Sequence, residues 1–168
     1  MSADYKSTIL LPKTDFPMKA GLPVREPNVL AKWEADDLYH RQRAMSKGRE
    51  PFILHDGPPY ANGHLHIGHA LNKILKDVIS RSQQMMGRDS VYVPGWDCHG
   101  LPIELKVLQK LSSKERDELT PVTLRKTAAE FAKETVAKQS ASFRRYGVWG
   151  NFDSPYLTLQ PEYEAEQI

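Results

Sequence analysis

The feature that most constrains the fold is a pair of short apolar runs on either side of one long amphipathic segment. Residues 52–54 and 91–93 are apolar runs of strand length, each followed by proline and glycine, and they predict buried strands. Between them, helical spacing relates the apolar residues Ile67, Ala70, Leu71, Ile74, Leu75, Val78 and Ile79. A strand–helix–strand unit of this kind is right-handed and makes its strands parallel. We therefore predict an α/β fold with a parallel sheet.

The rest of the chain is predicted to be mainly helical. Residues 1–28 contain four prolines and predict an extended arm that packs on another part of the protein. A short helix is expected from Asn28, as its cap, to residue 45. A second helix should begin near Pro102, and a longer one should run from Pro121 to just before Gly147.

The two loops after the predicted strands contain the residues best suited to chemistry. Parallel strands end at the same edge of a sheet, so residues 57–69 and 95–104 should emerge side by side. In open α/β sheets this edge is where ligands bind. Three of the six histidines of the chain lie within residues 64–69.

The histidines coincide with the predicted start of the long helix. Free N–H groups and a partial positive charge at a helix amino terminus attract phosphate. His66, in the first turn, could donate a hydrogen bond to a phosphoryl oxygen as charge builds in a transition state. Gly68 lacks a side chain, so a flat base or ribose could approach the backbone closely.

The histidines could instead form a cluster without function or a zinc site. Clustering at a strand-to-helix turn disfavours the first alternative. A zinc site would need ligands from among His64, His66, His69, Cys98 and His99. Their spacing matches no common structural zinc pattern, and a helix amino terminus repels a cation. We therefore expect no metal ligands in this chain.

Residues 58–69, Pro-Pro-Tyr-Ala-Asn-Gly-His-Leu-His-Ile-Gly-His, resemble the HIGH signature of class I aminoacyl-tRNA synthetases. The extended form is typical of the subgroup that activates isoleucine, valine, leucine or methionine. The resemblance implies a Rossmann-type nucleotide-binding domain that forms an aminoacyl adenylate from ATP with Mg²⁺. It implies that His66 and His69 are catalytic at the α-phosphate and that Gly68 lies under the adenine. The implied ATP-binding residues are Pro59, Tyr60, Ala61, Asn62, Gly63, His66, Ile67, Gly68 and His69.

Asp97 lies in the second loop, in the segment Gly-Trp-Asp-Cys-His-Gly-Leu-Pro. A carboxylate there could hold an amino group, although a turn or cap aspartate is the simpler assignment for this residue alone. The segment resembles that of the isoleucine-specific branch of the family. The resemblance implies that Asp97 binds the α-ammonium group beside the Gly57 backbone, and that Pro58 lines the side-chain pocket. Cys98 and His99 are adjacent in the chain and are not expected to form a catalytic pair.

Composition limits the class of protein. The 168 residues are 40% hydrophobic and 26% charged, as in ordinary globular proteins. A net charge of +2 does not indicate a nucleic-acid partner. A single cysteine excludes an intramolecular disulfide and fits a reducing compartment. No stretch resembles a membrane span or a signal peptide. We expect a soluble, cytoplasmic monomer with no membrane partner.

The resemblance covers the whole chain but only the first part of the family's length. We expect residues 1–50 to be an amino-terminal extension, and residues 51–168 to be the first half of the catalytic domain, ending before the editing insertion. The KMSKS signature is missing, because Met-Ser-Lys-Gly at 45–48 precedes the histidines and predicts a helix end. A helix start at 158–162 lies so near Ile168 that we expect the natural chain to continue. The family's zinc site is expected beyond it.

The resemblance implies that the complete protein attaches isoleucine to tRNA(Ile) through an isoleucyl-adenylate, and that this activity needs the missing carboxyl-terminal portion. One alternative is a class I synthetase for valine or leucine. Another is a non-catalytic nucleotide-binding module, which would account for the missing signature. Half a nucleotide fold, however, leaves a sheet edge unpaired and apolar helix faces uncovered. We therefore expect the isolated chain to be poorly soluble or partly molten.

Overall fold

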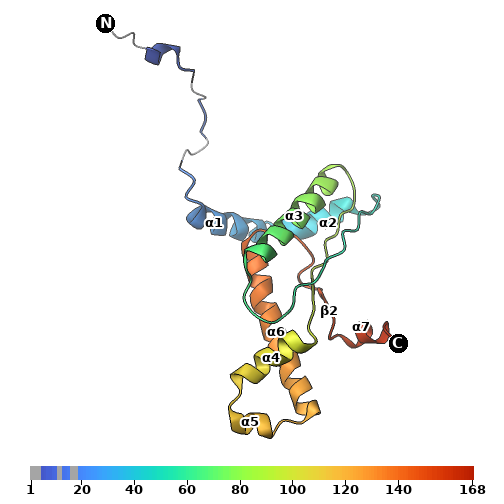
Figure 1. Ribbon diagram of the computed structural model, residues 1–168. Coiled ribbons are helices and arrows are strands. Elements are labelled where there is room, and N and C mark those ends of the chain that lie inside the picture. The colour runs from blue at the N-terminus through green and yellow to red at the C-terminus, as the bar shows by residue number, and fades with distance from the viewer. Residues whose placement is uncertain (1–4, 11–12, 16–18) are drawn as a thin grey trace.

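A computed structural model of the chain describes residues 5–10, 13–15 and 19–168. The short 3₁₀ helix η1 (Tyr5–Thr8) stands away from the body of the molecule (Figure 1). The arm predicted at residues 1–28 includes positions 1–4, 11–12 and 16–18, which lie outside the described residues. Among the described residues, no helix has the length and apolarity needed to cross a membrane.

Two helices precede the first loop, where a single helix was expected. They are α1 (Leu22–Ala35) and α2 (Leu38–Ser46). Gly21 adopts a left-handed φ of 51°, which lets α1 begin six residues before Asn28. The predicted cap at Asn28 is therefore wrong, as is the extended arm over the residues that α1 includes. Asp37, with a φ of 47°, interrupts the helical path between α1 and α2.

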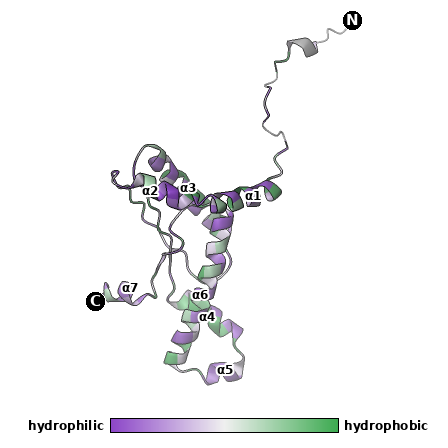
Figure 2. Cartoon of the chain, turned by 180° about the vertical axis from the view of Figure 1, so that it is seen from behind, coloured by the Kyte–Doolittle hydropathy of each residue, from purple (hydrophilic) through white to green (hydrophobic). Residues whose placement is uncertain are grey.

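The long amphipathic helix is present as predicted. This helix, α3, spans Ile67–Met85, and Gly87 follows its carboxyl-terminal cap with a φ of 92°. Figure 2 shows strongly hydrophobic and strongly hydrophilic positions along α3. The apolar stripe is exposed: Leu71 is 60% exposed and Val78 is 57% exposed. The buried residues of α3 are Ala70, Lys73, Ser80 and Gln84. The expectation of an uncovered apolar helix face is confirmed for α3.

The strands predicted at residues 52–54 and 91–93 are not observed. The sheet instead consists of β1 (Gly95–Trp96) and β2 (Tyr156–Leu157), which pair in parallel. The two segments expected to be strands do run parallel, but they meet only at isolated bridges. These bridges join Pro51 to Asp89 and Tyr60 to Asp97. The predicted parallel arrangement is present, whereas the predicted continuous ladder is wrong.

Side chains take the backbone groups that a continuous ladder would need. The Gly95 N–H donates to the Asp56 carboxylate at 3.0 Å, and the Ser90 N–H donates to the Gln84 side chain at 3.3 Å. Pro94 has no N–H to donate. Backbone pairing between the two segments is therefore confined to their ends.

The chain after the second loop is largely helical. Its helices are α4 (Leu101–Lys110), α5 (Ser113–Asp117), α6 (Pro121–Arg145) and α7 (Pro161–Ala165). α4 has Pro102 in its first turn, and α6 is capped by the Thr120 hydroxyl and followed by Gly147 with a φ of 78°, as predicted. α5 and β2 were not predicted. Figure 1 shows α4, α5 and the start of α6 projecting from the end of the body opposite α2 and α3.

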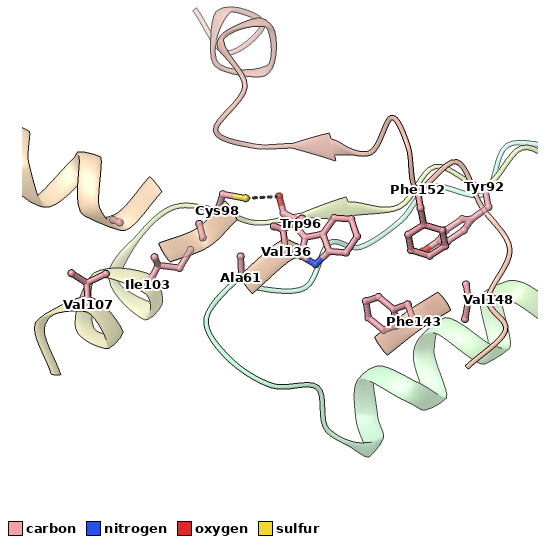
Figure 3. Close-up of a cluster of buried hydrophobic side chains, with 12 residues drawn as sticks. Ala61, Tyr92, Trp96, Cys98, Ile103, Val107, Val136, Phe143, Val148 and Phe152 are labelled. Carbon is pink, nitrogen blue, oxygen red and sulfur yellow. Dashed lines mark hydrogen bonds between the residues drawn. The ribbon is translucent and has the colours of Figure 1, made fainter. Parts of the chain in front are cut away.

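The hydrophobic core lies where the two loops meet α4 and α6 (Figure 3). Trp96 is fully buried near the centre of this cluster, and its ring centroid lies 6.3 Å from that of Phe143 on α6. Ala61 contributes from the first loop, and Ile103 contributes from α4. Packing around Trp96 fixes the position of its neighbour Asp97, the residue with a predicted binding role.

Candidate active site

The two predicted loops are joined backbone to backbone. The Asp97 N–H donates to the Pro59 carbonyl at 2.9 Å, and the Ala61 N–H donates to the Asp97 carbonyl at 2.8 Å. These bonds hold the predicted amino-acid-binding residue directly beside the predicted ATP-binding stretch. The side-by-side placement of the two loops, expected from a parallel unit, is present in the structure.

A reciprocal pair of histidines caps the amino terminus of α3. The Nδ1 atom of His66 accepts from the Gly68 N–H at 3.1 Å, and the Nδ1 atom of His69 accepts from the His66 N–H at 3.2 Å. The arrangement is a capping box, in which imidazoles take the places that serine and glutamate commonly fill. The two ring centroids are 3.9 Å apart.

The capping box selects one tautomer of each histidine. A neutral imidazole has one acceptor and one donor nitrogen, so accepting at Nδ1 places the proton on Nε2. Partial burial, together with His66 and Lys73, lowers the pKa of His69 below its ordinary 6.5. His69 is therefore neutral at pH 7, with its Nε2–H available as a donor.

Gly68 is required by the cap itself. A Cβ atom at this position would lie 2.9 Å from Cε1 and 3.0 Å from Nδ1 of the His66 ring. A side chain would therefore displace the imidazole from the amide that it caps. This contact adds a second reason for glycine, beside the predicted close approach of a base.

A buried charge cluster, here named the Asp56 cluster and formed by Asp56, Lys73 and Lys76, ties the first loop to α3. The Asp56 carboxylate accepts from the Lys73 ammonium and, at 2.7 Å, from the Lys76 ammonium. Its third donor is the Gly95 N–H. The side chains of Asp56 and Lys73 are 0% and 2% exposed. One carboxylate thus fixes the start of the first loop against both α3 and β1.

The Asp56 cluster carries an excess of one positive charge. Burial alone would raise the pKa of Asp56, but Lys73 and the hydrogen bonds from Lys73, Lys76 and Gly95 lower it overall. Burial lowers the pKa of Lys73, and the charge of Asp56 opposes this shift. Because Asp56 stays ionised between two lysines, the cluster adds a positive potential beside the histidine cap.

A cavity of about 240 Å³ lies at the histidine cap. Its lining residues are Gly57, Pro59, His66, Gly68, His69, Asn72 and Lys73. Asn62 and Gly63 instead line a separate cavity of about 630 Å³ that also contains Lys106, Lys110 and Lys138. The structure thus gathers part of the predicted site around one cavity. Tyr60, Ala61 and Asp97 are joined to this part through the backbone, and Pro58 lies in the same loop.

Cys98 and His99 face different surroundings. Burial raises the pKa of the Cys98 thiol to about 11, which keeps it protonated. The Nε2 atom of His99 lies 3.1 Å from the Glu164 carboxylate. The two side chains thus have different partners, and the expectation that they do not form a catalytic pair stays a prediction. In the part of the chain that the structure describes, no three histidine, cysteine or acidic residues form a group able to hold a metal ion.

Sequence reasoning did not identify the Asp56 cluster. Lys73 does not belong to the apolar stripe of α3, yet it is buried. One signal was available, because Lys73 follows His69 by four residues and must share its helix face. A second signal was the position of Asp56 immediately before Gly57, the first residue of the loop.

The family that the sequence resembles matches most of the chain. A model of this family, described as tRNA synthetases class I (I, L, M and V), matches residues 28–168. The chain belongs to this family. The match extends well beyond the histidine motif and includes all of α2 through α7.

Three relatives bear the name isoleucine–tRNA ligase. The protein of Gloeobacter violaceus is 61% identical over 165 residues, and that of Nostoc punctiforme is 60% identical over 167 residues. The protein of Thermoanaerobacter sp. strain X514 is 56% identical over 165 residues. These alignments cover 98–99% of this synthetase chain and 17–18% of the relatives. The chain therefore spans less than a fifth of their length.

A solved structure with a similar fold is the agnB2 LeuRS of Agrobacterium radiobacter K84, in a ternary complex with tRNA and LeuAMS. It superposes with a TM-score of 0.67 at 23% identity. The superposition covers 86% of this synthetase chain and 17% of the other. At this identity the likeness concerns the fold alone.

Proposed function

We propose that the complete protein attaches isoleucine to tRNA(Ile) through an isoleucyl-adenylate, with this chain supplying the first half of the adenylate-forming site. The observation that carries the proposal is the direct backbone pairing of Ala61 and Pro59 with Asp97 beside the histidine cap of α3. The high identity to proteins named isoleucine–tRNA ligase supports isoleucine as the amino acid. The histidine motif at residues 58–69 supports ATP as the nucleotide.

In the proposed reaction, a carboxylate oxygen of isoleucine bonds to the α-phosphorus of ATP, and the bond from that phosphorus to pyrophosphate breaks. Negative charge builds on the non-bridging oxygens of the α-phosphate. The Nε2–H groups of His66 and His69 would donate to these oxygens, and the positive amino terminus of α3 would add to their stabilisation. Mg²⁺ would enter with the ATP phosphates and offset part of their charge.

Asp97 is proposed to hold the α-ammonium group of isoleucine. One of its carboxylate oxygens, Oδ1, accepts from the His99 N–H at 3.2 Å, which orients the side chain. No described side chain pairs with the other oxygen, so it is free to accept from an ammonium group. Gly57 would contribute its backbone, and Pro58 would line the pocket for the isoleucine side chain.

The remaining parts of the proposal concern organisation. Residues 51–168 would form the first half of a Rossmann-type domain, and residues 1–50 would precede it as an extension. The parallel pairing of β1 with β2 and the fold likeness support the Rossmann-type part of this proposal. The zinc site, the tRNA contacts and the editing activity of the family are assigned to the part of its sequence that lies beyond these 168 residues.

The role of the histidine cap is tested by His69→Ala in the complete gene product. We expect isoleucine-dependent ATP–pyrophosphate exchange to slow by about 10²-fold, because a donor to the transition state is lost. His40→Ala is the matched control, since His40 lies on the exposed surface of α2 beside Asp37. An exchange rate for His69→Ala equal to that of His40→Ala would rule out the proposed role.

The role of Asp97 is tested separately by Asp97→Ala. We expect the KM for isoleucine to rise about tenfold or more while the KM for ATP changes little, because only the amino acid carries an ammonium group. Steady-state exchange with each substrate varied in turn measures the two constants. An equal rise in both would show that Asp97 acts only through the structure of the loop.

A further inference from the structure

A single carboxamide on α6 is bonded to both loops of the candidate site. Gln139 is buried, with 2% exposure. Its Oε1 atom accepts from the Trp96 Nε1–H at 2.9 Å. Its Nε2 atom donates to the Tyr60 carbonyl at 3.1 Å and to the Gly63 carbonyl at 2.7 Å. These three interactions are named the Gln139 bridge.

The chemistry of the bridge requires an amide. The indole N–H of Trp96 can only donate, and the carbonyls of Tyr60 and Gly63 can only accept. A side chain with one acceptor and two donor hydrogens matches all three partners at once. The partner groups therefore fix the orientation of the Gln139 amide. Either a carboxylate or an apolar side chain would leave the Tyr60 and Gly63 carbonyls without the donor that the amide supplies.

The bridge closes a ring that contains both loops. Trp96 is covalently joined to Asp97, whose backbone pairs with Ala61, and Ala61 is joined to Tyr60. Gln139 links Tyr60 back to Trp96. A displacement of one loop relative to the other must break either the backbone pair or the bridge.

Thr135 provides a contrast on the same helix. It is buried one turn before Gln139, but its hydroxyl donates to the Phe131 carbonyl of α6 at 2.9 Å. Of these two buried polar residues of α6, only Gln139 makes a side-chain hydrogen bond to the loops. A purely structural contribution to α6 can therefore be separated experimentally from an effect on the site.

We infer that Gln139 is a positioning residue for adenylate formation, which holds the ATP-binding stretch at 60–63 and the segment bearing Asp97 in one fixed arrangement. This inference rests on the proposed function. Gln139 itself does not contact substrate. Its effect is expected on both substrates, because the stretch at 60–63 is assigned to ATP and Asp97 is assigned to isoleucine.

The test is Gln139→Met in the complete gene product, which keeps the side-chain length and removes all three hydrogen bonds. We expect kcat for pyrophosphate exchange to fall about 10–100-fold, since displacements of about 1 Å are costly in positioned reactions. The KM values for isoleucine and ATP should both rise. Thr135→Val, the matched control, should change each constant by less than about threefold.

A second readout does not depend on activity. Hydrogen exchange in the complete gene product should become faster at the Ala61 and Asp97 amides in Gln139→Met, while the interior of α6 stays protected. If Gln139→Met does not fold, Gln139→Asn keeps the amide, withdraws it by one methylene and should produce the same pattern more weakly.

Two results would overturn the inference. One is a set of kinetic constants for Gln139→Met that match those of Thr135→Val, and the other is unchanged hydrogen exchange at the Ala61 and Asp97 amides. Absence of isoleucine-dependent activity in the unmodified protein would instead refute the proposed function. In that case the hydrogen-exchange result would still decide whether Gln139 holds the loops together.

Discussion

The stretch from Asp56 to Gly63, at the start of the first loop, is held at its two ends by different kinds of interaction. At its start, the Asp56 cluster uses one carboxylate and two lysines of α3. Four residues later, the Gln139 bridge uses a neutral amide of α6. The charged end also places a positive potential beside the histidine cap, whereas the neutral end only fixes position. The difference teaches that α3 and α6 both hold the loop in place, whereas only α3 also contributes charge to the site.

The comparison predicts that breaking the charged end costs more stability than breaking the neutral end. Asp56→Ala would leave Lys73 buried without its counter-charge, and we expect a loss of about 3–5 kcal/mol. The loss should appear as a lower unfolding midpoint in urea. Asp36→Ala is the matched control, because its pair with Lys32 has the same 2.7 Å separation as the Lys76–Asp56 pair but lies on the exposed surface at the end of α1. That control should lose less than about 1 kcal/mol.

If Asp56→Ala were no more destabilising than Asp36→Ala, the Asp56 cluster would contribute no more than an ordinary surface pair. The contrast between the two ends of the loop would then fail. Lys76 cannot replace the missing counter-charge of Lys73, because it carries the same charge and also loses its partner. Rescue by the second lysine is therefore not expected.

Gln139→Met should have a smaller effect on stability, of about 1–3 kcal/mol, because the groups left unpaired are neutral. Its effect on the kinetics of ATP–pyrophosphate exchange should nevertheless exceed that of Thr135→Val. The same urea midpoints measure the stability difference. A loss larger than that of Asp56→Ala would reverse the proposed division between the two ends.

The smallest expected effect is a pH dependence at the histidine cap. The pKa of His69 is lowered in the folded state, so the unfolded chain binds more protons than the folded chain between the two pKa values. Stability therefore falls as the pH drops below about 6.5, and it is fully present above that value. Protonation at Nδ1 would also remove the acceptor for the His66 N–H. Amide exchange at His66 should become faster relative to the α3 interior as the pH falls from 7 to 5.

In His69→Ala the pH-dependent part of this exchange at the His66 amide should disappear. A cap whose protection stays constant from pH 7 to 5 would show that His69 does not titrate through its capping nitrogen. The neutral donor tautomer assigned to it would then lose its basis.

The sequence predicted the parts of the fold that depend on local patterns. The bounds of α3, with His66 before it and Gly87 after it, follow from periodicity and from terminal residues. Periodicity identified the apolar face of this helix but could not show which face is covered. The apolar stripe is exposed and Lys73 is buried, because a long-range partner, Asp56, determines that burial.

Features that depend on distant partners were not predictable in this way. The runs at 52–54 and 91–93 have strand composition, yet the side chain of Asp56 occupies the Gly95 N–H that a ladder would use. The bond between Gln139 and Trp96 joins residues 43 positions apart in the chain, and helical periodicity carries no information on such a link. The two loops were expected side by side, and the Gln139 bridge that helps to hold them there comes from a residue outside both motifs.

The most direct test of the central claim is the amino-acid dependence of ATP–pyrophosphate exchange by the complete gene product. The two joined loops and the histidine cap predict ATP- and Mg²⁺-dependent exchange. The identity to proteins named isoleucine–tRNA ligase predicts that this exchange is fastest with isoleucine and slower with valine and leucine. Exchange that is faster with valine or leucine would assign the proposed amino-acid site to a different amino acid. A complete lack of exchange, whichever amino acid is supplied, would contradict the claim that these loops form half of an adenylate-forming site.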